Sequence, residues 1–365
     1  MTTLSKNTVA VAMSGGVDSS VAALLLKEQG MDVIGLSMKT HNSSEEENCG
    51  TKTCCTVSDI NDARRVCQIL DIPFYAMDHV EEFREKVVNY FVKEYGQGRT
   101  PNPCVMCNTH LKFSALLKQA RQLGAYYLAT GHYAQKVRDR AGKYHLVKAK
   151  DKAKDQTYFL FGLGQEELEH TLFPIGCHTK AEVRGFARGA GLATAEKPES
   201  QEICFVPDND YAGFIEREAP KHRSKPGAFV NENGDVLGEH RGVHAYTIGQ
   251  RRGLNVPANE RMYVKEIVPE ENKVVLGSKD SLLKSGLTAK DMKWVNRDLA
   301  AADGMEVEVK IRHRQEGVPG VLRVVNDYTV RVEFKRPEGP ITPGQAAVIY
   351  HDDEVLGGGW IEKGI

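Results

Sequence analysis

The chain has 365 residues, of which 41% are hydrophobic and 27% charged, a composition typical of globular proteins that excludes wholesale disorder. Its 48 basic and 49 acidic residues give a net charge of −1, which excludes a protein that binds nucleic acid by being basic throughout. The length predicts two or three domains. Neither a long apolar run nor a leader-like N-terminus is present, which favours a soluble cytoplasmic protein.

The first half of the sequence alternates short apolar runs with helix-like stretches. We predict strands at 9–13, 33–38, 72–77 and 126–130, and helices at 21–29 and 58–70, the second capped by Ser58. Strands separated by helices indicate βαβ units. The sequence therefore predicts an α/β domain with a parallel sheet up to about residue 205.

The pattern changes after about residue 210. A period-two alternation around Asn233-Gly234 predicts a hairpin. Further short strands, separated by Gly and Pro turns, are predicted at 263–268, 273–276, 306–311, 320–325, 329–334 and 346–350. We expect two small antiparallel β-barrels behind the α/β domain, with domains at 1–210, 211–284 and 285–365.

Residues 14–20, Ser-Gly-Gly-Val-Asp-Ser-Ser, join the first predicted strand to the first predicted helix. Glycines let backbone N–H groups approach an anion closely, serines add hydroxyl donors, and the following helix directs its positive end to the same point. No Gly-Lys-Ser/Thr is present, so this is not the Walker-type loop that holds a γ-phosphate with lysine. A phosphate-binding loop explains the serines and the aspartate better than a plain turn does.

This loop resembles the signature of the PP-loop ATP pyrophosphatases, which cleave ATP between its α- and β-phosphates and adenylate a substrate. The resemblance implies that Gly15, Gly16, Asp18, Ser19 and Ser20 bind the pyrophosphate end with Mg²⁺. The ATP site is completed by residues of the loop and by two residues at the carboxyl ends of strands, where nucleotides bind in such sheets: Ala12, Met13, Ser14, Val17, Met38 and Gly131.

Three of the eight cysteines belong to motifs. Cys104 and Cys107 form a CxxC, which we expect in a loop stiffened by two prolines, ahead of a helix from about His110. Cys204 follows almost a hundred residues later. A lone CxxC serves zinc, redox chemistry or neither, and a structural zinc site would want four ligands.

The other five cysteines belong to no motif. Three lie in a polar loop after the second predicted strand and have an open role: Cys49, Cys54 and Cys55. Two are interpreted as ordinary small apolar residues: Cys67 and Cys177.

Over nearly its full length the chain resembles the tRNA-specific 2-thiouridylases, the MnmA family. The motifs that carry the resemblance occur in order: GRTPNPCVMCNTHLKF (98–113), ATGHYA (129–134), KDQTYFL (154–160), SQEICF (200–205), YTIGQRRGL (246–254), KIRHRQ (310–315) and PGQAAVIY (343–350). The resemblance implies a sulfurtransferase that makes 2-thiouridine at wobble position 34 of tRNA with ATP. It also implies a sulfur-donating protein as partner and no membrane.

The C2 oxygen of uracil is a poor leaving group, and transferring AMP to it makes a good one. The base must also leave the stack to be reached. By resemblance Cys204 carries a persulfide, Cys107 is the nucleophile, and a disulfide bond belongs to the cycle. Asn102, Pro103 and Cys104 would face the target base.

Cys104 departs from the family pattern, which has aspartate at this position. A thiol with a reference pKa of about 8.5 does not copy a permanently charged carboxylate. Cys104 is then either a third redox thiol beside Cys107 and Cys204, or one of three ligands of a [4Fe–4S] cluster whose fourth iron delivers hydrosulfide. The persulfide is the default of the family.

A basic run lies between residues 136 and 154, with eight basic and two acidic side chains, a local excess of six positive charges. Such a run is usually a solvated face. The resemblance favours tRNA binding, and its candidate contacts are His132, Lys154, Asp155, Gln156, Arg312, His313 and Gln345, with Arg251, Arg252 and Arg314 as further candidates. Phosphate contacts predict a salt-sensitive interaction.

Three rival functions are open at this point. The nearest is another PP-loop enzyme, such as an amidating synthetase acting on a metabolite, which would not need the CxxC and Cys204. The others are a non-catalytic RNA-binding protein and a zinc-stabilised RNA-modifying enzyme.

Overall fold

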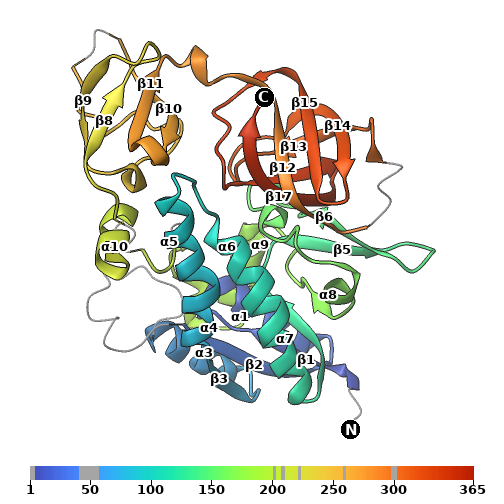
Figure 1. Cartoon of the computed structure of the whole chain (residues 1–365). Coiled ribbons are helices and arrows are strands. Elements are labelled where there is room, and N and C mark those ends of the chain that lie inside the picture. Colours follow the sequence, from blue (N-terminus) through green and yellow to red (C-terminus); the bar gives the residue numbers. More distant parts are fainter. Residues whose placement is uncertain are drawn as a thin grey trace.

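The computed structural model of the chain describes residues 5–40, 57–199, 203–206, 210–220, 223–257, 260–296 and 302–365. An N-terminal α/β part, blue to green in Figure 1, carries two β-rich parts at one end, one yellow and one orange to red. Cys49, Cys54 and Cys55 lie outside the described residues. Within the described ranges, no helix is long and apolar enough to cross a membrane.

A five-stranded parallel sheet forms the α/β part, in the order β3-β2-β1-β4-β7. Its strands are β1 (Ser5–Ala12), β2 (Asp32–Lys39), β3 (Phe74–Asp78), β4 (Ala125–Thr130) and β7 (Thr171–Leu172). Successive residues of β1 serve two cores, because Val9 and Val11 pack on one face and Ala10 on the other. A strand buried on both faces needs an unbroken apolar run, and that run made it predictable.

Helices cover both faces of this sheet. One layer contains α1 (Val17–Glu28), α3 (Val57–Ile69) and α9 (Lys180–Gly189). The other contains α4 (Val80–Phe83), the π-helix η1 (Arg84–Val88), α5 (Asn89–Gly96), the π-helix η2 (Cys107–Leu116) and α7 (Leu117–Gln122). The remaining helical segments of this part are α6 (Pro103–Met106), η3 (Thr157–Phe159), α8 (Gln165–Glu169) and η4 (Ala193–Glu196), and α10 (Tyr211–Glu218) follows them in the chain.

The CxxC lies on a helix, and its expected placement in a loop is wrong. The helix begins at Pro103 as α6, so Cys104 belongs to its first turn, and Cys107 opens η2 directly behind it. Proline suits the first helical position, because its fixed φ matches the helix and the N–H that it lacks would have no helical partner there. The prolines therefore start the helix early rather than delay it to His110.

Two predicted helix starts also shift. Helix α1 begins at Val17, directly after Gly16, so the loop runs into the helix without a linker. Ser58 lies inside α3 instead of capping it, because the helix already includes Val57.

The central β-domain contains a four-stranded sheet in the order β10-β11-β8-β9. Its strands are β8 (Gly227–Val230), β9 (Val236–His240), β10 (Tyr263–Val268) and β11 (Lys273–Gly277), with the short helices η7 (Val243–Ala245), η8 (Pro269–Glu271) and η9 (Asp280–Leu282) between or behind them. The hairpin predicted at Asn233-Gly234 joins β8 and β9. One pair of this sheet, β8 with β11, is parallel.

The C-terminal domain is a closed antiparallel barrel of six strands. Its order is β12-β15-β14-β13-β16-β17, and β17 returns to pair with β12. The strands are β12 (Lys284–Trp294), β13 (Glu306–Lys310), β14 (Val318–Asn326), β15 (Thr329–Glu338), β16 (Ala346–His351) and β17 (Glu354–Gly364). Closure leaves no unpaired edge within the barrel.

A hairpin of the N-terminal part is attached to this barrel. Strands β5 (Ala134–Arg138) and β6 (Tyr144–Lys148) extend the sheet beyond β17. One hydrophobic core continues across the junction, since Tyr158 and Leu160 pack in the same cluster as Val348 and Tyr350. The Tyr158 hydroxyl donates to the carbonyl of Ala346 at 3.0 Å. The predicted fold class, an α/β domain with a parallel sheet followed by two small β-domains, is confirmed.

Candidate active site

One cavity of about 1350 Å³ lies at the carboxyl ends of β1, β2 and β4 and reaches the C-terminal barrel. Its wall includes Met13 after β1, Met38 at the end of β2 and Gly131 after β4, and Lys310 and His313 of the barrel close the opposite side. Carboxyl ends of parallel strands are where α/β folds bind ligands, because the loops diverge there and the helices begin there.

The loop at 14–20 presents backbone donors to this cavity. Helix α1 starts at Gly16 with no side-chain cap, so the first N–H groups of the helix remain available to an anion. The two predicted serine donors serve the loop itself: Ser19 Oγ donates to the Gly16 carbonyl at 3.2 Å, and Ser20 Oγ does so at 2.8 Å. Ser19 Oγ also accepts from the Ser14 N–H, which fixes the loop's curvature.

Two glycines are required by close backbone contacts. Gly15 has φ +69°, and a Cβ there would lie 2.2 Å from the carbonyl oxygen of Asp59. A Cβ on Gly131 would lie 2.6 Å from the backbone nitrogen of Ser19. The loop is thus clamped between α3 and the turn after β4, which holds its donors in place before any ligand arrives.

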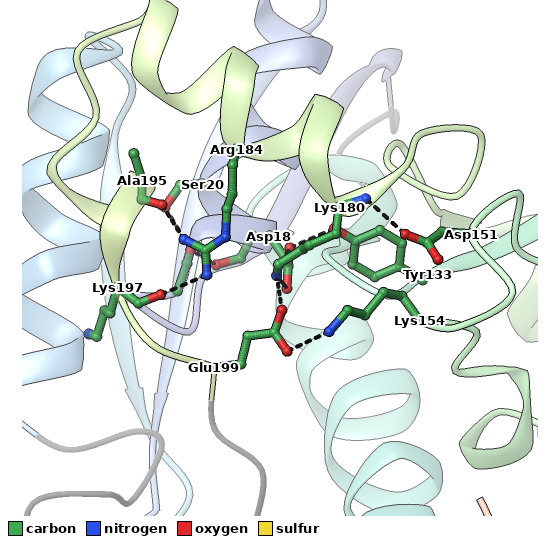
Figure 2. Close-up of polar contacts among 12 residues, drawn as sticks. Asp18, Ser20, Tyr133, Asp151, Lys154, Lys180, Arg184, Ala195, Lys197 and Glu199 are labelled. Atoms are coloured by element: carbon green, nitrogen blue, oxygen red, sulfur yellow. Dashed lines mark hydrogen bonds and ion pairs between the residues drawn. The ribbon is translucent and has the colours of Figure 1, made fainter. Parts of the chain in front are cut away.

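Asp18 is the first member of a chain of alternating charges, shown in Figure 2. Both of its carboxylate oxygens accept from Lys180 Nζ, at 2.7 and 2.8 Å, and one also accepts from the Tyr133 hydroxyl at 2.9 Å. Lys180 Nζ also lies 3.0 Å from Glu199, whose other oxygen accepts from Lys154 Nζ at 2.8 Å. The phosphate loop is thereby linked to the residue that precedes the SQEICF motif.

A second lysine that sequence reasoning missed supports the loop from the other side. Lys197 Nζ donates to the Gly15 carbonyl and to the carboxylates of Asp59 and Asp62, at 3.1, 2.7 and 2.6 Å. Arg184 donates to the carbonyls of Ala195 and Lys197 and so holds this segment on α9 (Figure 2). Neither Lys180 nor Lys197 lies in a motif that we singled out, so only the three-dimensional arrangement identifies them.

Most of the residues expected at the ATP site line the cavity. Those that do are Ala12, Met13, Ser14, Gly16, Val17, Asp18, Ser19, Met38 and Gly131. Gly15 and Ser20 are not part of its wall, because Gly15 packs on α3 and Ser20 is fully buried beneath the loop.

The three motif cysteines, two of them almost a hundred residues from the third, line the same cavity as the loop. Cys104 is exposed, and Cys107 and Cys204 are half-buried. Cys204 is held by its neighbour Phe205, whose ring makes edge contacts with Phe83 and Phe91, at centroid distances of 5.6 and 5.1 Å. An aromatic anchor next to the thiol fixes its backbone while the side chain stays accessible.

The resemblance implies Mg²⁺ and leaves an iron–sulfur cluster open, and both would need suitable side chains as ligands. Among the residues that the structure describes, no three His, Cys, Asp or Glu side chains are grouped so as to hold one metal ion. No single-ion site is therefore formed by Cys104, Cys107 and Cys204. Mg²⁺ needs fewer protein ligands, because one carboxylate together with phosphate oxygens suffices. Asp18 of the loop lines the cavity and could supply that carboxylate.

The described cysteines contain no disulfide. Cys67 is buried in the core between α3 and the sheet, as expected, and burial raises the pKa of its thiol to about 12. Cys177 is exposed and does not line the cavity.

His132 lies on the wall of the cavity and is buried. Burial, assisted by the positive charge of Lys112, holds the pKa of its imidazole well below its usual range, so the ring is neutral at neutral pH. Its Nδ1 lies 2.8 Å from the Thr130 hydroxyl, and its ring is tilted over Phe113.

In the Lys154–Gln156 turn, two of the three side chains form hydrogen bonds within the protein, whereas the resemblance predicts that they contact tRNA. Asp155 is buried, and its carboxylate accepts from the N–H of Ala149 and the hydroxyl of Thr157, at 3.0 and 2.8 Å. Gln156 Oε1 accepts from the N–H of Tyr133 at 2.9 Å. All three residues line the cavity, and Asp155 shapes the turn that carries Lys154.

The remaining tRNA candidates are divided: Arg314 lines the main cavity, and Arg251 and Arg252 line neither of the two cavities. His313 lines the main cavity, with its ring 4.4 Å from that of Phe159. Arg312 and Gln345 line a separate cavity of about 500 Å³, which also contains Thr100 and Gln250. Asn102 is buried directly before α6 and lines neither cavity, whereas Pro103 and Cys104 line the main one.

The basic run at 136–154 is largely compensated by acids from elsewhere in the chain. Ion pairs join Lys148 to Glu308, Lys150 to Glu182, Lys152 to Asp353 and Lys154 to Glu199. Lys136 donates to the carbonyl of Leu168, and burial lowers its pKa to about 8. The excess of charge in the sequence therefore overstates the positive charge on this face.

Comparison with known proteins identifies the three parts of the chain. Residues 7–208 match the family model described as tRNA methyl transferase HUP domain, residues 213–278 the tRNA methyl transferase PRC-barrel domain, and residues 284–361 the Aminomethyltransferase beta-barrel domain. The sheet, the loop and these matches together define an enzyme of the HUP-domain class that carries two β-domains.

Full-length relatives narrow the class to one family. The chain is 49% identical to the tRNA-specific 2-thiouridylase MnmA of Geobacter metallireducens, over 99% of this chain and 98% of that protein. It is 50% identical to the one of Geotalea uraniireducens, over 98% and 95%. It belongs to the family of tRNA-specific 2-thiouridylases, MnmA. Among solved structures, the NMN synthetase of Francisella tularensis matches 56% of this chain and 71% of its own, at 16% identity, with a TM-score of 0.33, too slight a likeness to support an argument.

Proposed function

We propose that this protein transfers sulfur to C2 of the wobble uridine, position 34, of tRNA in a cytoplasmic, ATP-dependent reaction, and that a sulfur-donating protein supplies the sulfur. One observation carries the proposal: the phosphate loop, Cys107 and Cys204 bound a single cavity although they are far apart in the sequence. A rival that only bound RNA, or that amidated a metabolite, would have no use for two thiols beside an adenylation loop.

The reaction begins with adenylation. The uracil C2 oxygen attacks the α-phosphorus of ATP and pyrophosphate leaves, so the oxygen becomes part of a phosphate ester. The N–H groups at the start of α1 and Lys180 face the negative charge that accumulates on the leaving group. Mg²⁺, with Asp18 as its protein ligand, would supply further charge neutralisation when bound.

Sulfur transfer follows. The terminal sulfur of a Cys204 persulfide adds to C2, and the Cys107 thiolate then attacks the inner sulfur of Cys204. The S–S bond of the persulfide breaks, AMP leaves with the C2 oxygen, and the thiocarbonyl forms. The two cysteines are oxidised to a disulfide while the transferred sulfur is reduced, so a thiol reductant must restore them before the next turnover.

The exposed Cys104 is proposed as a thiol beside this pair and not as a carboxylate substitute. The persulfide is the default of the family, so no step is assigned to iron. Anaerobic reconstitution with iron and sulfide tests this assignment. A charge-transfer absorbance together with a gain in activity would replace the persulfide by cluster-bound hydrosulfide.

The proposal is tested by mass analysis of tRNA nucleosides after reaction with ATP and a persulfide donor. We expect 2-thiouridine from the wild type, none from Cys107→Ser or Cys204→Ser, and wild-type amounts from the control Cys177→Ser, an exposed cysteine outside the cavity. Cys104→Asp restores the residue of the family pattern and should retain activity. Thiolation by Cys204→Ser at the wild-type rate would refute the proposal.

Lys154, Gln156, His132 and His313 are proposed to contact the tRNA at this cavity, and Arg312 and Gln345 at the second one. Contacts to phosphates release counterions, so the affinity for tRNA should fall steeply between low and moderate salt. An affinity that hardly changes with salt would argue against these surfaces.

A further inference from the structure

Asn108, a residue on the wall of the cavity, carries a polar atom that has no hydrogen-bond partner among the described residues. Asn108 follows Cys107 directly, is 3% exposed and lines the cavity. Its Nδ2 donates to the carbonyl of Phe159 at 3.1 Å, while its Oδ1 is buried and accepts no hydrogen bond from any residue that the structure describes. A buried carbonyl oxygen without a donor is costly, so such an atom in a site calls for a ligand that supplies one.

The orientation of this amide is fixed by chemistry. A backbone carbonyl only accepts, so the NH₂ group of Asn108 must face Phe159 and the oxygen must face the other way. The missing partner is therefore an N–H or O–H donor. An acceptor at the same place would be repelled by the lone pairs of the oxygen.

The surroundings favour a flat, uncharged ligand. His132 is neutral in this wall because burial keeps the pKa of its imidazole low. Phe159 and His313 offer two aromatic rings, tilted at 38° to each other with a centroid distance of 4.4 Å. Aromatic walls with one directed polar group are how unstacked bases are held by proteins.

We propose that Asn108 reads the target base, with its Oδ1 accepting the N3–H of the flipped uracil; this inference rests on the proposed function. N3 is the only ring donor of uracil in a nucleoside, and it adjoins C2, the carbon that reacts. Asn108 and Cys107 line the same cavity, so a group that holds N3 keeps C2 in the cavity that the Cys107 thiol lines. Cytosine has a lone pair at N3 and would meet the same oxygen with repulsion, so Asn108 selects uridine over cytidine.

The other unpartnered polar atom on this wall does not lead to a ligand. Thr40 Oγ1 is also buried, but it follows Met38 on the nucleotide side of the cavity. A hydroxyl both donates and accepts, so it specifies no particular group. The fixed amide of Asn108 is the more informative of the two.

The test uses Asn108→Ala with three anticodon stem-loops that carry uridine, cytidine or 3-methyluridine at position 34. The wild type should thiolate uridine at least about tenfold faster than either analogue, the effect expected when a site's polar group is left unpaired. In Asn108→Ala the kcat/KM for uridine should fall by about tenfold or more, and the ratio of uridine to cytidine should fall as well. The space left by the Asn108 side chain should raise the rate of thiolation of 3-methyluridine relative to that of uridine.

The matched control is Thr194→Val, which removes another buried, unpartnered polar atom that lies outside the cavity. Thr194→Val should leave the relative rates of the three substrates unchanged. The wild type and both variants should bind the stem-loops with similar affinity, because phosphates dominate binding. A purely structural role of Asn108 would lower the rates of all three substrates equally and overturn the inference.

The wild type supplies an independent check if Asn108→Ala does not fold. Thiolation of 3-methyluridine as fast as uridine by the wild type would overturn the inference without any variant. A wild type that thiolates no uridine at all would instead overturn the proposed function, so the two failures are distinguishable.

Discussion

Lys180 is expected to stabilise the folded protein, and Lys180→Met tests this. Its ammonium group is bound by both oxygens of Asp18 and by Glu199, and its side chain is only 12% exposed. Methionine keeps the length and the apolar stem but leaves two carboxylates facing each other without a cation between them.

The size of the effect follows from burial. Exposed ion pairs contribute about 0–1 kcal/mol, whereas removing one partner of a buried pair costs about 3–5 kcal/mol. Asp18 and Glu199 have side chains 32% and 26% exposed, so this site lies between the two cases. We expect Lys180→Met to lose about 2 kcal/mol of unfolding free energy.

The control is Lys150→Met. Lys150 pairs with Glu182, but the two side chains are 51% and 42% exposed. Its loss should change stability by less than about 0.5 kcal/mol. Urea unfolding followed by circular dichroism measures both variants, and calorimetric titration with ATP should show weaker binding for Lys180→Met only. Equal unfolding midpoints for the two variants would refute the reasoning.

Three further predictions concern a loop, a domain junction and a thiol. Gly131→Ala should weaken ATP binding at least about tenfold in calorimetric titration, because its Cβ would press on the backbone of the loop. Gly185 lies in α9 with open space around it, so Gly185→Ala should raise stability by about 0.5–1 kcal/mol in thermal unfolding. Burial opposes protonation of His145, but its hydrogen bonds to Glu354 and Asp139 raise the pKa of the imidazole overall. Protonated His145 therefore stabilises the folded protein below about pH 6.5, and this contribution is lost as the pH rises through the pKa of His145 in the folded state. His145→Gln should abolish that slope in unfolding free energy, and an unchanged slope would contradict it. Cys67, with its pKa raised to about 12, should resist alkylation by iodoacetamide at pH 8 in the folded protein, as mass spectrometry would show, while exposed cysteines react.

The parts of the fold that were predictable have local causes. The strands of the parallel sheet are buried on both faces, so their sequences are apolar runs. The hairpin between β8 and β9 was predictable because its turn contains Asn233-Gly234, a residue pair that tight hairpin turns favour. The loop at 14–20 stood out because its glycines, serines and aspartate are contiguous, and its binding of phosphate stays a prediction.

The parts that were not predictable depend on contacts between distant residues. The pairing of β12 with β17 closes the barrel, and the placement of β5 and β6 against it joins the first half of the chain to the last; no local pattern encodes either contact. Lys180 and Lys197 gain their roles from Asp18, Asp59 and Asp62, which lie more than a hundred residues away. The early helix at Pro103 was missed because proline marks both loops and first helical turns.

The continuous core at the junction determines how the protein could be recombined. Tyr158 and Leu160 pack in one buried cluster with Val348 and Tyr350, so the barrel shares a hydrophobic core with the α/β part. Exchanging barrels with a relative would succeed only if these buried surfaces matched in volume, whatever the crossover sequence. The position of the barrel against the α/β part is consequently set by apolar side chains.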